Sequence, residues 1–101
     1  MTDESTSTDS APGDYISRQV IVASDNGLHA RPAGRLAQAA QSFESAITLI
    51  HKDQEADAKS ILDILTLAAE PGHVLELRAS GADAEEALTR LEQLFKNKFE
   101  G

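Results

Sequence analysis

One histidine and one arginine, His29 and Arg31, lie two residues apart and directly before Pro32. Proline suits the first turn of a helix, where its missing amide hydrogen is no loss, so a helix is expected to begin at about residue 29 or 30. The start of a helix carries unpaired backbone amides and about half a positive charge, and it attracts anions such as phosphate. His29 therefore places a nucleophilic imidazole beside a predicted phosphate site.

Arg31 would add a planar, permanently charged donor that matches phosphate geometry. The sequence contains no Gly-x-x-x-x-Gly-Lys loop for a nucleotide. The pattern thus predicts a histidine that receives a phosphoryl group from another protein and passes it on. The alternative is a histidine that only caps or fills the turn, and for a single histidine this is the more common case.

The composition restricts the partners. The chain has 101 residues, a formal net charge of −8 and no cysteine. It is expected to form one domain, because this length supports a single modest core. Nucleic acid and anionic membranes are not expected as partners, since both attract basic surfaces. Without cysteine there are no disulfides or thiolate metal sites, which is typical of a cytoplasmic protein.

Hydrophobic periodicity predicts seven elements after an acidic tail. Residues 1–14 contain Asp3, Glu4, Asp9 and Asp14 and almost no apolar side chains, so this tail is expected to be disordered. Strands are predicted at 15–23, 46–52, 54–58 and 73–79, and helices at 30–43, 60–67 and 84–99. The order βαββαβα indicates an α+β domain, residues 15–101, with a four-stranded antiparallel sheet covered on one face by three helices.

Two helix starts carry capping signals. Ser60 is a favoured N-cap residue, with Asp63 at the position of a capping-box acid. Asp83 and Glu86 are expected to form the same box at the start of the last helix. Lys52-Asp53 is expected to be a hairpin turn, although it lacks glycine.

Three sequence blocks resemble one bacterial family. The first resembles the active-site motif of HPr, the histidine phosphocarrier of the phosphoenolpyruvate-dependent phosphotransferase system, and it reads Gly27-Leu28-His29-Ala30-Arg31-Pro32-Ala33. The second and third are Ala58-Lys59-Ser60-Ile61-Leu62 and Ala79-Ser80-Gly81-Ala82-Asp83. The resemblance covers residues 15 to about 99. It implies the HPr open-faced β-sandwich and a carrier that is not itself an enzyme.

The resemblance also implies partners and site residues. His29 would be phosphorylated by enzyme I, with Arg31 stabilising the phosphate, and would pass the group to IIA domains of sugar permeases or to regulatory acceptors. Ser60 would be a regulatory site for an HPr kinase/phosphorylase. The implied docking patch beside the histidine consists of Ala30, Ile61, Leu62 and Leu65. A monomer without a metal or another cofactor is expected.

A second hypothesis remains open. The chain would act as a regulatory adaptor of carbon or nitrogen metabolism, binding a kinase or a transcriptional regulator according to phosphorylation at Ser60. Asp63 argues against regulation, because its charge would lie one turn from a phosphate on Ser60 and repel it. His51 and His73 match no catalytic position and are interpreted as structural or solvent-exposed.

Overall fold

Alternating apolar residues decide which face of each strand is buried. The computed structural model describes residues 14–99, with strands β1 (Ile16–Ile21), β2 (Ala46–His51), β3 (Gln54–Asp57) and β4 (Val74–Ser80). They form one sheet in the order β1-β4-β2-β3, in which all neighbours are antiparallel. In the central pair Leu49 lies opposite Leu77, and both are fully buried. The predicted four-stranded antiparallel sheet is confirmed.

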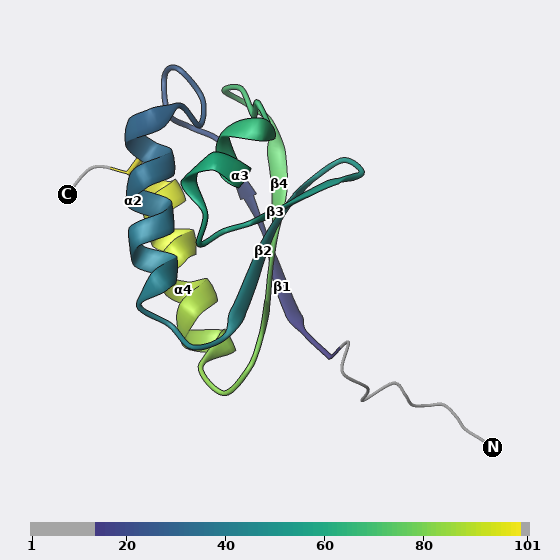
Figure 1. Ribbon diagram of the computed structural model, residues 1–101. Coiled ribbons are helices and arrows are strands. Elements are labelled where there is room, and N and C mark those ends of the chain that lie inside the picture. Colours follow the sequence, from purple (N-terminus) through teal and green to yellow (C-terminus); the bar gives the residue numbers. More distant parts are fainter. Residues whose placement is uncertain (1–13, 100–101) are drawn as a thin grey trace.

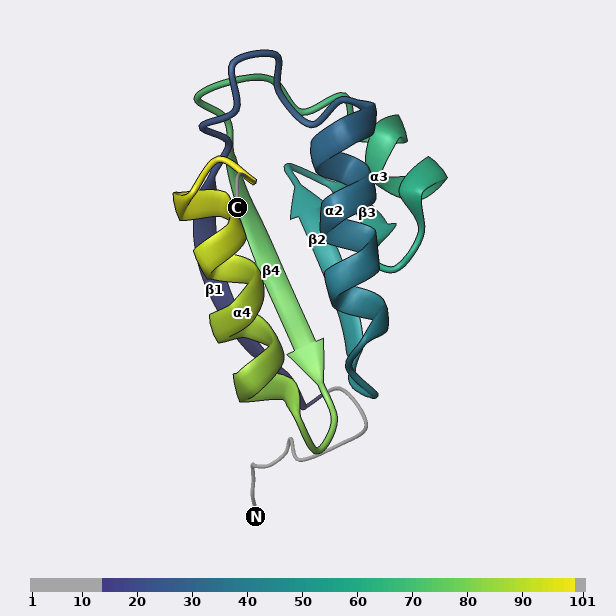
Figure 2. The same cartoon turned by 90° about the vertical axis from the view of Figure 1, so that its left-hand side faces the viewer.

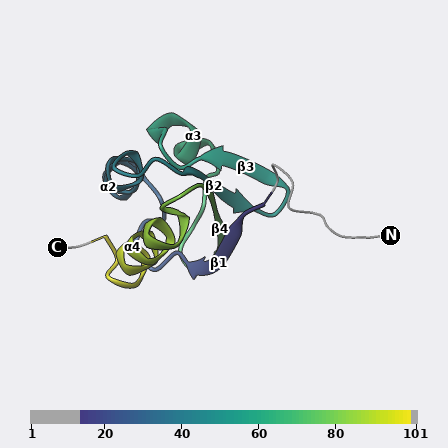
Figure 3. The ribbon, with the colours of Figure 1, turned by 90° about the horizontal axis from the view of Figure 1, so that it is seen from below.

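Three helices, α2 (Ala30–Gln41), α3 (Ile61–Thr66) and α4 (Ala84–Lys96), lie on one face of this sheet (Figures 1 and 2). Seen from below, the helices form one layer and the strands the other (Figure 3). Small residues Ala33, Ala37 and Ala40 are buried on α2, so this helix turns its small side chains towards the core. The largest fully buried side chains between the layers are Leu36, Leu49, Ile64, Leu75, Leu77, Leu88, Leu91 and Phe95.

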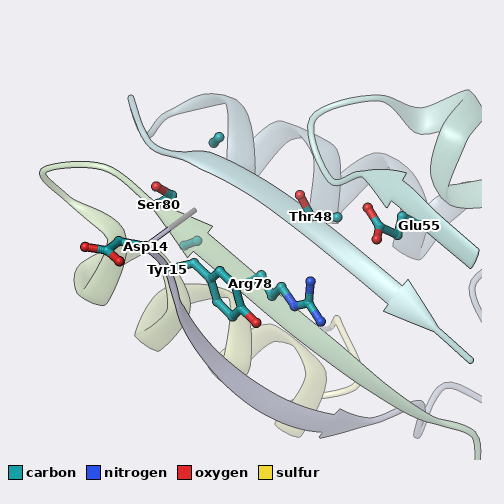
Figure 4. Close-up of a pocket in the computed structure, with 8 residues that line it drawn as sticks. Asp14, Tyr15, Thr48, Glu55, Arg78 and Ser80 are labelled. Carbon is teal, nitrogen blue, oxygen red and sulfur yellow. The ribbon is translucent and has the colours of Figure 1, made fainter. Parts of the chain in front are cut away.

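No helix of residues 14–99 covers the other face of the sheet (Figure 3). A shallow hollow of about 180 Å³ lies there, and Asp14, Tyr15, Thr48, Glu55, Arg78 and Ser80 are among its lining residues (Figure 4). Arg78 is held in its lining, because its guanidinium lies 4.6 Å from the centre of the Tyr15 ring and its Nε donates a 2.8 Å hydrogen bond to Glu76. The sheet is thus open on one side, as the resemblance implied.

The last helix is shorter than predicted. It ends at Lys96 instead of residue 99, because Lys98 and Phe99 adopt left-handed φ angles of 56° and 61°. The Phe99 amide bonds back to the Leu94 carbonyl oxygen at 2.8 Å, and the Phe99 ring is buried edge-on against Phe95. Burial of this aromatic ring favours the reversal of the chain. The first strand and first helix also end two residues before the predicted positions.

One predicted cap forms and one does not. Ser60 Oγ accepts a 3.2 Å hydrogen bond from the Asp63 amide, so the Ser60 N-cap is confirmed. Asp83 makes no cap on its own helix, and the predicted box with Glu86 is wrong. The Asp83 carboxylate accepts 2.9 Å bonds from the amides of Glu44 and Ser45 instead. It therefore ties the start of α4 to the segment before β2.

Two further predictions concern short segments. Lys52 and Asp53 join β2 to β3 as a two-residue turn, since His51 pairs with Gln54, and Lys52 takes the left-handed φ of 59°. The predicted hairpin is therefore present without glycine. The predicted acidic tail, residues 1–14, lies outside the described residues except for Asp14.

Candidate functional site

The loop between β1 and α2 is held against a distant segment. The amide of Leu28 donates a 3.0 Å hydrogen bond to the Ala69 carbonyl oxygen, and the Gly27 amide bonds back to Ser24. Gly27 has a φ of +75°, and a Cβ there would lie 2.4 Å from the Ala69 oxygen. Only glycine fits both the backbone angle and this close approach. The segment that follows α3 therefore requires glycine at position 27.

His29 is the N-cap residue of α2, as the position of Pro32 predicted. Its backbone is extended, with φ −87° and ψ −168°, and its carbonyl oxygen accepts the first helical bond from Ala33 at 2.9 Å. Its side chain makes no capping hydrogen bond and is exposed to solvent. The imidazole is therefore available for chemistry and is not needed to complete the helix.

The charge at this helix start is unbalanced. No acidic residue lies in the first turn of α2, whereas Glu85 and Glu86 lie in the first turn of α4 and Asp63 in that of α3. The positive end of the α2 dipole is thus left without a nearby anion on its own helix. This is the charge distribution that a phosphate site at a helix N-terminus requires.

A cavity of about 400 Å³ opens beside His29. Three cationic side chains contribute to it, Arg31, Arg35 and Lys98, against one carboxylate, Asp25. Its remaining lining residues are Ser24, Asn26, His29, Pro32 and Phe99. The structure thus brings the predicted pair His29 and Arg31 together in one cavity. An excess of positive charge here contrasts with the acidic chain as a whole, and it favours an anionic ligand.

The sequence interpretation did not assign Arg35, Lys98 or Ser24 to this site. Arg35 follows Arg31 by four residues, so helical spacing alone could have placed both on one face. Lys98 carries no comparable signal, because it reaches the cavity only through the left-handed turn after α4. α2 begins and α4 ends at the same end of the molecule (Figure 2).

The residues assigned to docking lie on α2 and α3, outside the lining of this cavity, and they differ in exposure. Ala30 is exposed at the start of α2. On α3, Ile61 is 42% and Leu62 is 75% exposed, whereas Leu65 is half-buried against the core. The Ile61 Cδ1 atom lies 4.0 Å from the position that a Cβ on Gly34 would take, so the exposed end of α3 adjoins α2. Ile61 and Leu62 thus form an apolar surface beside the helix that begins at His29.

Ser60 is half-buried and surrounded by polar contacts. Besides its bond from the Asp63 amide, its own amide donates to the Asp57 carbonyl oxygen at 3.0 Å. The Asp63 carboxylate accepts a 3.3 Å bond from the Asp57 amide and does not reach back to Ser60, so the capping box is only half formed. The carboxylate of Asp57 accepts from the Lys59 amide at 2.9 Å. Ser60 therefore caps α3 between two acidic residues.

The other two histidines lie together, away from the cavity lining. The His51 and His73 rings stack with centroids 4.6 Å apart, and His73 Nδ1 accepts a 3.0 Å hydrogen bond from the Glu70 amide. Within residues 14–99, no group of three or more histidine, aspartate or glutamate side chains is placed to hold a metal ion. The helices of that same range include none that is long and apolar enough to cross a bilayer.

The sequence is similar to those of known phosphocarrier proteins. The family model described as the PTS HPr component phosphorylation site matches residues 16–97. Phosphocarrier protein HPr of Treponema pallidum (strain Nichols) is 42% identical over 85 residues, which cover 84% of this chain and 97% of that protein. Phosphocarrier protein NPr of Proteus mirabilis (strain HI4320) is 37% identical and covers 82% and 93% of the two chains.

The fold is also similar to that of solved HPr structures. The crystal structure of HPr-C-His from Thermoanaerobacter tengcongensis superposes with a TM-score of 0.81 at 37% identity, covering 83% of this chain and 94% of that one. The architecture is therefore the HPr open-faced β-sandwich, and members of this family are carriers, not catalysts. The chain belongs to the HPr family of phosphocarrier proteins of the phosphotransferase system.

Proposed function

We propose that His29 is the residue that carries the phosphoryl group, received from phospho-enzyme I and passed to IIA domains of sugar permeases or to regulatory acceptors. The observation that carries this proposal is the exposed imidazole at the uncompensated start of α2, in a cavity with three cationic side chains. Family membership supports enzyme I and IIA domains as partners. Because the chain belongs to this family, we also propose a cytoplasmic location.

The transfer needs little from the carrier beyond position and charge. The lone pair of an unprotonated His29 ring nitrogen attacks phosphorus while the bond from phosphorus to the donor breaks, and that electron pair returns to the donor. Arg31 and the α2 amides stabilise the equatorial oxygens during this exchange. The reverse sequence, with an acceptor in place of the donor, releases the group. Incubation with enzyme I and phosphoenolpyruvate tests the proposal, because it should yield an acid-labile, base-stable phosphate that His29→Ala lacks.

The partner surface in this proposal comprises Ala30, Ile61, Leu62 and Leu65. Exposure of Ile61 and Leu62 next to α2 supports it, since an exposed apolar pair beside a reactive residue is a typical contact surface. Leu65 contributes less area, because it is half-buried against the core. A partner that covers this surface would also exclude water from the cavity beside His29, which strengthens the electrostatic interactions there.

The alternative role, a regulatory adaptor that works through phosphorylated Ser60, has less support. One similar structure, at 34% identity, is that of the Bacillus subtilis catabolite repression protein Crh. A phosphate on Ser60, however, would lie beside the carboxylates of Asp57 and Asp63. Repulsion between these like charges disfavours the modified form. We therefore propose that Ser60 acts mainly as the N-cap of α3. Incubation of the intact chain with an HPr kinase and ATP should leave it unlabelled, and stoichiometric labelling of Ser60 would support the adaptor.

A further inference from the structure

The turn after α4 is unusual because two consecutive residues other than glycine adopt left-handed angles. Lys98 has a φ of 56° and Phe99 a φ of 61°. Each such residue costs free energy, so the surrounding contacts must hold the turn in place. Those contacts are the bond from the Phe99 amide to Leu94, the bond from the Lys98 amide to Phe95, and the buried Phe99 ring.

A fourth contact connects this turn to the cavity. Arg35 Nη1 on α2 donates a 2.8 Å hydrogen bond to the carbonyl oxygen of Phe99. The bond joins residues 64 positions apart and brings Lys98 into the lining of the cavity that contains His29 and Arg31. The strained turn therefore has a clear consequence, which is the position of Lys98.

A second observation concerns the charge of the cavity lining. Arg31, Arg35 and Lys98 contribute three positive charges against the single carboxylate of Asp25. Ser24 also lines the cavity and is only 7% exposed. The excess of positive charge favours an anionic ligand.

We propose that Lys98 is a further phosphoryl-positioning residue, held at the cavity by the Arg35–Phe99 hydrogen bond, and that it stabilises the dianion on phosphorylated His29. This inference rests on the proposed function of His29. Lysine suits the role because its ammonium group is a compact charge on a flexible stem, which can approach a phosphoryl oxygen without a fixed geometry. Arg35 positions Lys98 through the Phe99 carbonyl and adds its own charge to the cavity.

The test measures the equilibrium constant for phosphoryl transfer between enzyme I and the intact chain. Lys98→Met removes the charge, and Lys96→Met is the matched control. It removes the same charge two residues away, on an exposed side chain outside the cavity lining. We expect Lys98→Met to shift the equilibrium about fivefold towards phospho-enzyme I, as for one partly screened ion pair. Lys98→Arg and Lys96→Met should stay within about twofold of the wild-type value.

A second variant separates this role from a structural one. Lys98→Gly removes the charge and also suits the left-handed backbone, so its melting temperature should not fall. Its transfer equilibrium should nevertheless shift as in Lys98→Met. If both variants match Lys96→Met while the wild-type chain is labelled at His29, the inference about Lys98 is overturned and the carrier function stands. If the wild-type chain takes no label at His29, the carrier proposal fails and this inference fails with it.

Discussion

The hydrogen bond from the Leu28 amide to the Ala69 carbonyl oxygen, 3.0 Å long, joins the loop before His29 to the segment after α3. Gly27 makes this contact possible, because its missing Cβ leaves room for the same oxygen. The position of the reactive residue thus depends on a backbone contact between segments about 40 residues apart.

Gly27→Ala should therefore destabilise the fold and misplace His29. The added Cβ would meet the Ala69 oxygen at 2.4 Å, and the φ of +75° disfavours alanine. We expect a loss of about 2–4 kcal/mol in the free energy of unfolding, measured with urea, and slower labelling of His29. Gly72→Ala is the control, because Gly72 also has a positive φ but a Cβ added there would meet no atom within 4 Å. It should cost only about 1 kcal/mol, and equal losses in the two variants would contradict a role for the Ala69 contact.

Asp83 should make the fold sensitive to acid. The hydrogen bond from Ser45 Oγ, followed by that from the Glu44 amide, lowers the pKa of the Asp83 carboxyl below its ordinary value of 3.8. A carboxyl whose pKa is lowered by folding stabilises the protein above its unfolded pKa, and this contribution is lost as the pH falls through the folded value. Urea midpoints measured from pH 7 down to pH 2 should thus fall more steeply for wild type than for Asp83→Asn.

A control variant makes the comparison specific. Glu86→Gln removes an exposed carboxylate from the first turn of α4 and leaves the Asp83 bonds in place. The urea midpoint of Glu86→Gln should decrease below pH 4 as steeply as that of the wild type. Parallel curves for wild type and Asp83→Asn over the whole range would show that the bonds to residues 44–45 contribute nothing.

Leu62→Ser should weaken partner binding and leave the phosphorylated histidine unaffected. Leu62 is 75% exposed on α3, so its replacement costs little stability. Loss of one apolar contact at an interface predicts about a tenfold higher KM for phosphoryl transfer from enzyme I, with kcat within about twofold. Val74→Ser removes a similar exposed apolar side chain from the start of β4, outside the lining of the His29 cavity, and should change neither constant. A raised KM in Val74→Ser alone would indicate that partners dock around the start of β4.

Ser60→Ala should act on stability alone. It removes the acceptor for the Asp63 amide, and the loss of an N-cap side chain costs about 1 kcal/mol. The measurement is urea unfolding together with the initial rate of His29 labelling, which should stay within about twofold of wild type. Ser60→Asp should recover part of the stability, because aspartate also caps helices. A large change in the labelling rate in both variants would support a regulatory role for Ser60.

Several parts of this structure follow from short-range patterns. Pro32 predicted the start of α2 at His29, and the alternation of Leu75, Leu77 and Ala79 predicted which side of β4 is buried. Ser60 was predicted as a cap from its residue type and the distance to Asp63. Each of these depends on a few neighbouring residues, so the sequence is sufficient to predict them.

The remaining features depend on contacts across the fold. Asp83 has the residue type and spacing of a helix cap, but its carboxylate accepts hydrogen bonds from the amides of Glu44 and Ser45 instead. Helix propensity predicts that α4 continues to Phe99. In the structure, burial of the Phe99 ring favours a reversal of the chain after Asn97. Lys98 could be placed at the cavity only once that reversal was known.

Labelling of the intact chain with enzyme I and radioactive phosphoenolpyruvate tests the central proposal most directly. The controls are His29→Ala, and the double variant His51→Ala/His73→Ala, which keeps His29 and removes the other two histidines of the sequence. We predict one acid-labile, base-stable phosphate per chain in the wild type and in any folded double variant, and none in His29→Ala. Phosphate retained in folded His29→Ala would contradict the assignment of His29 as the carrier residue.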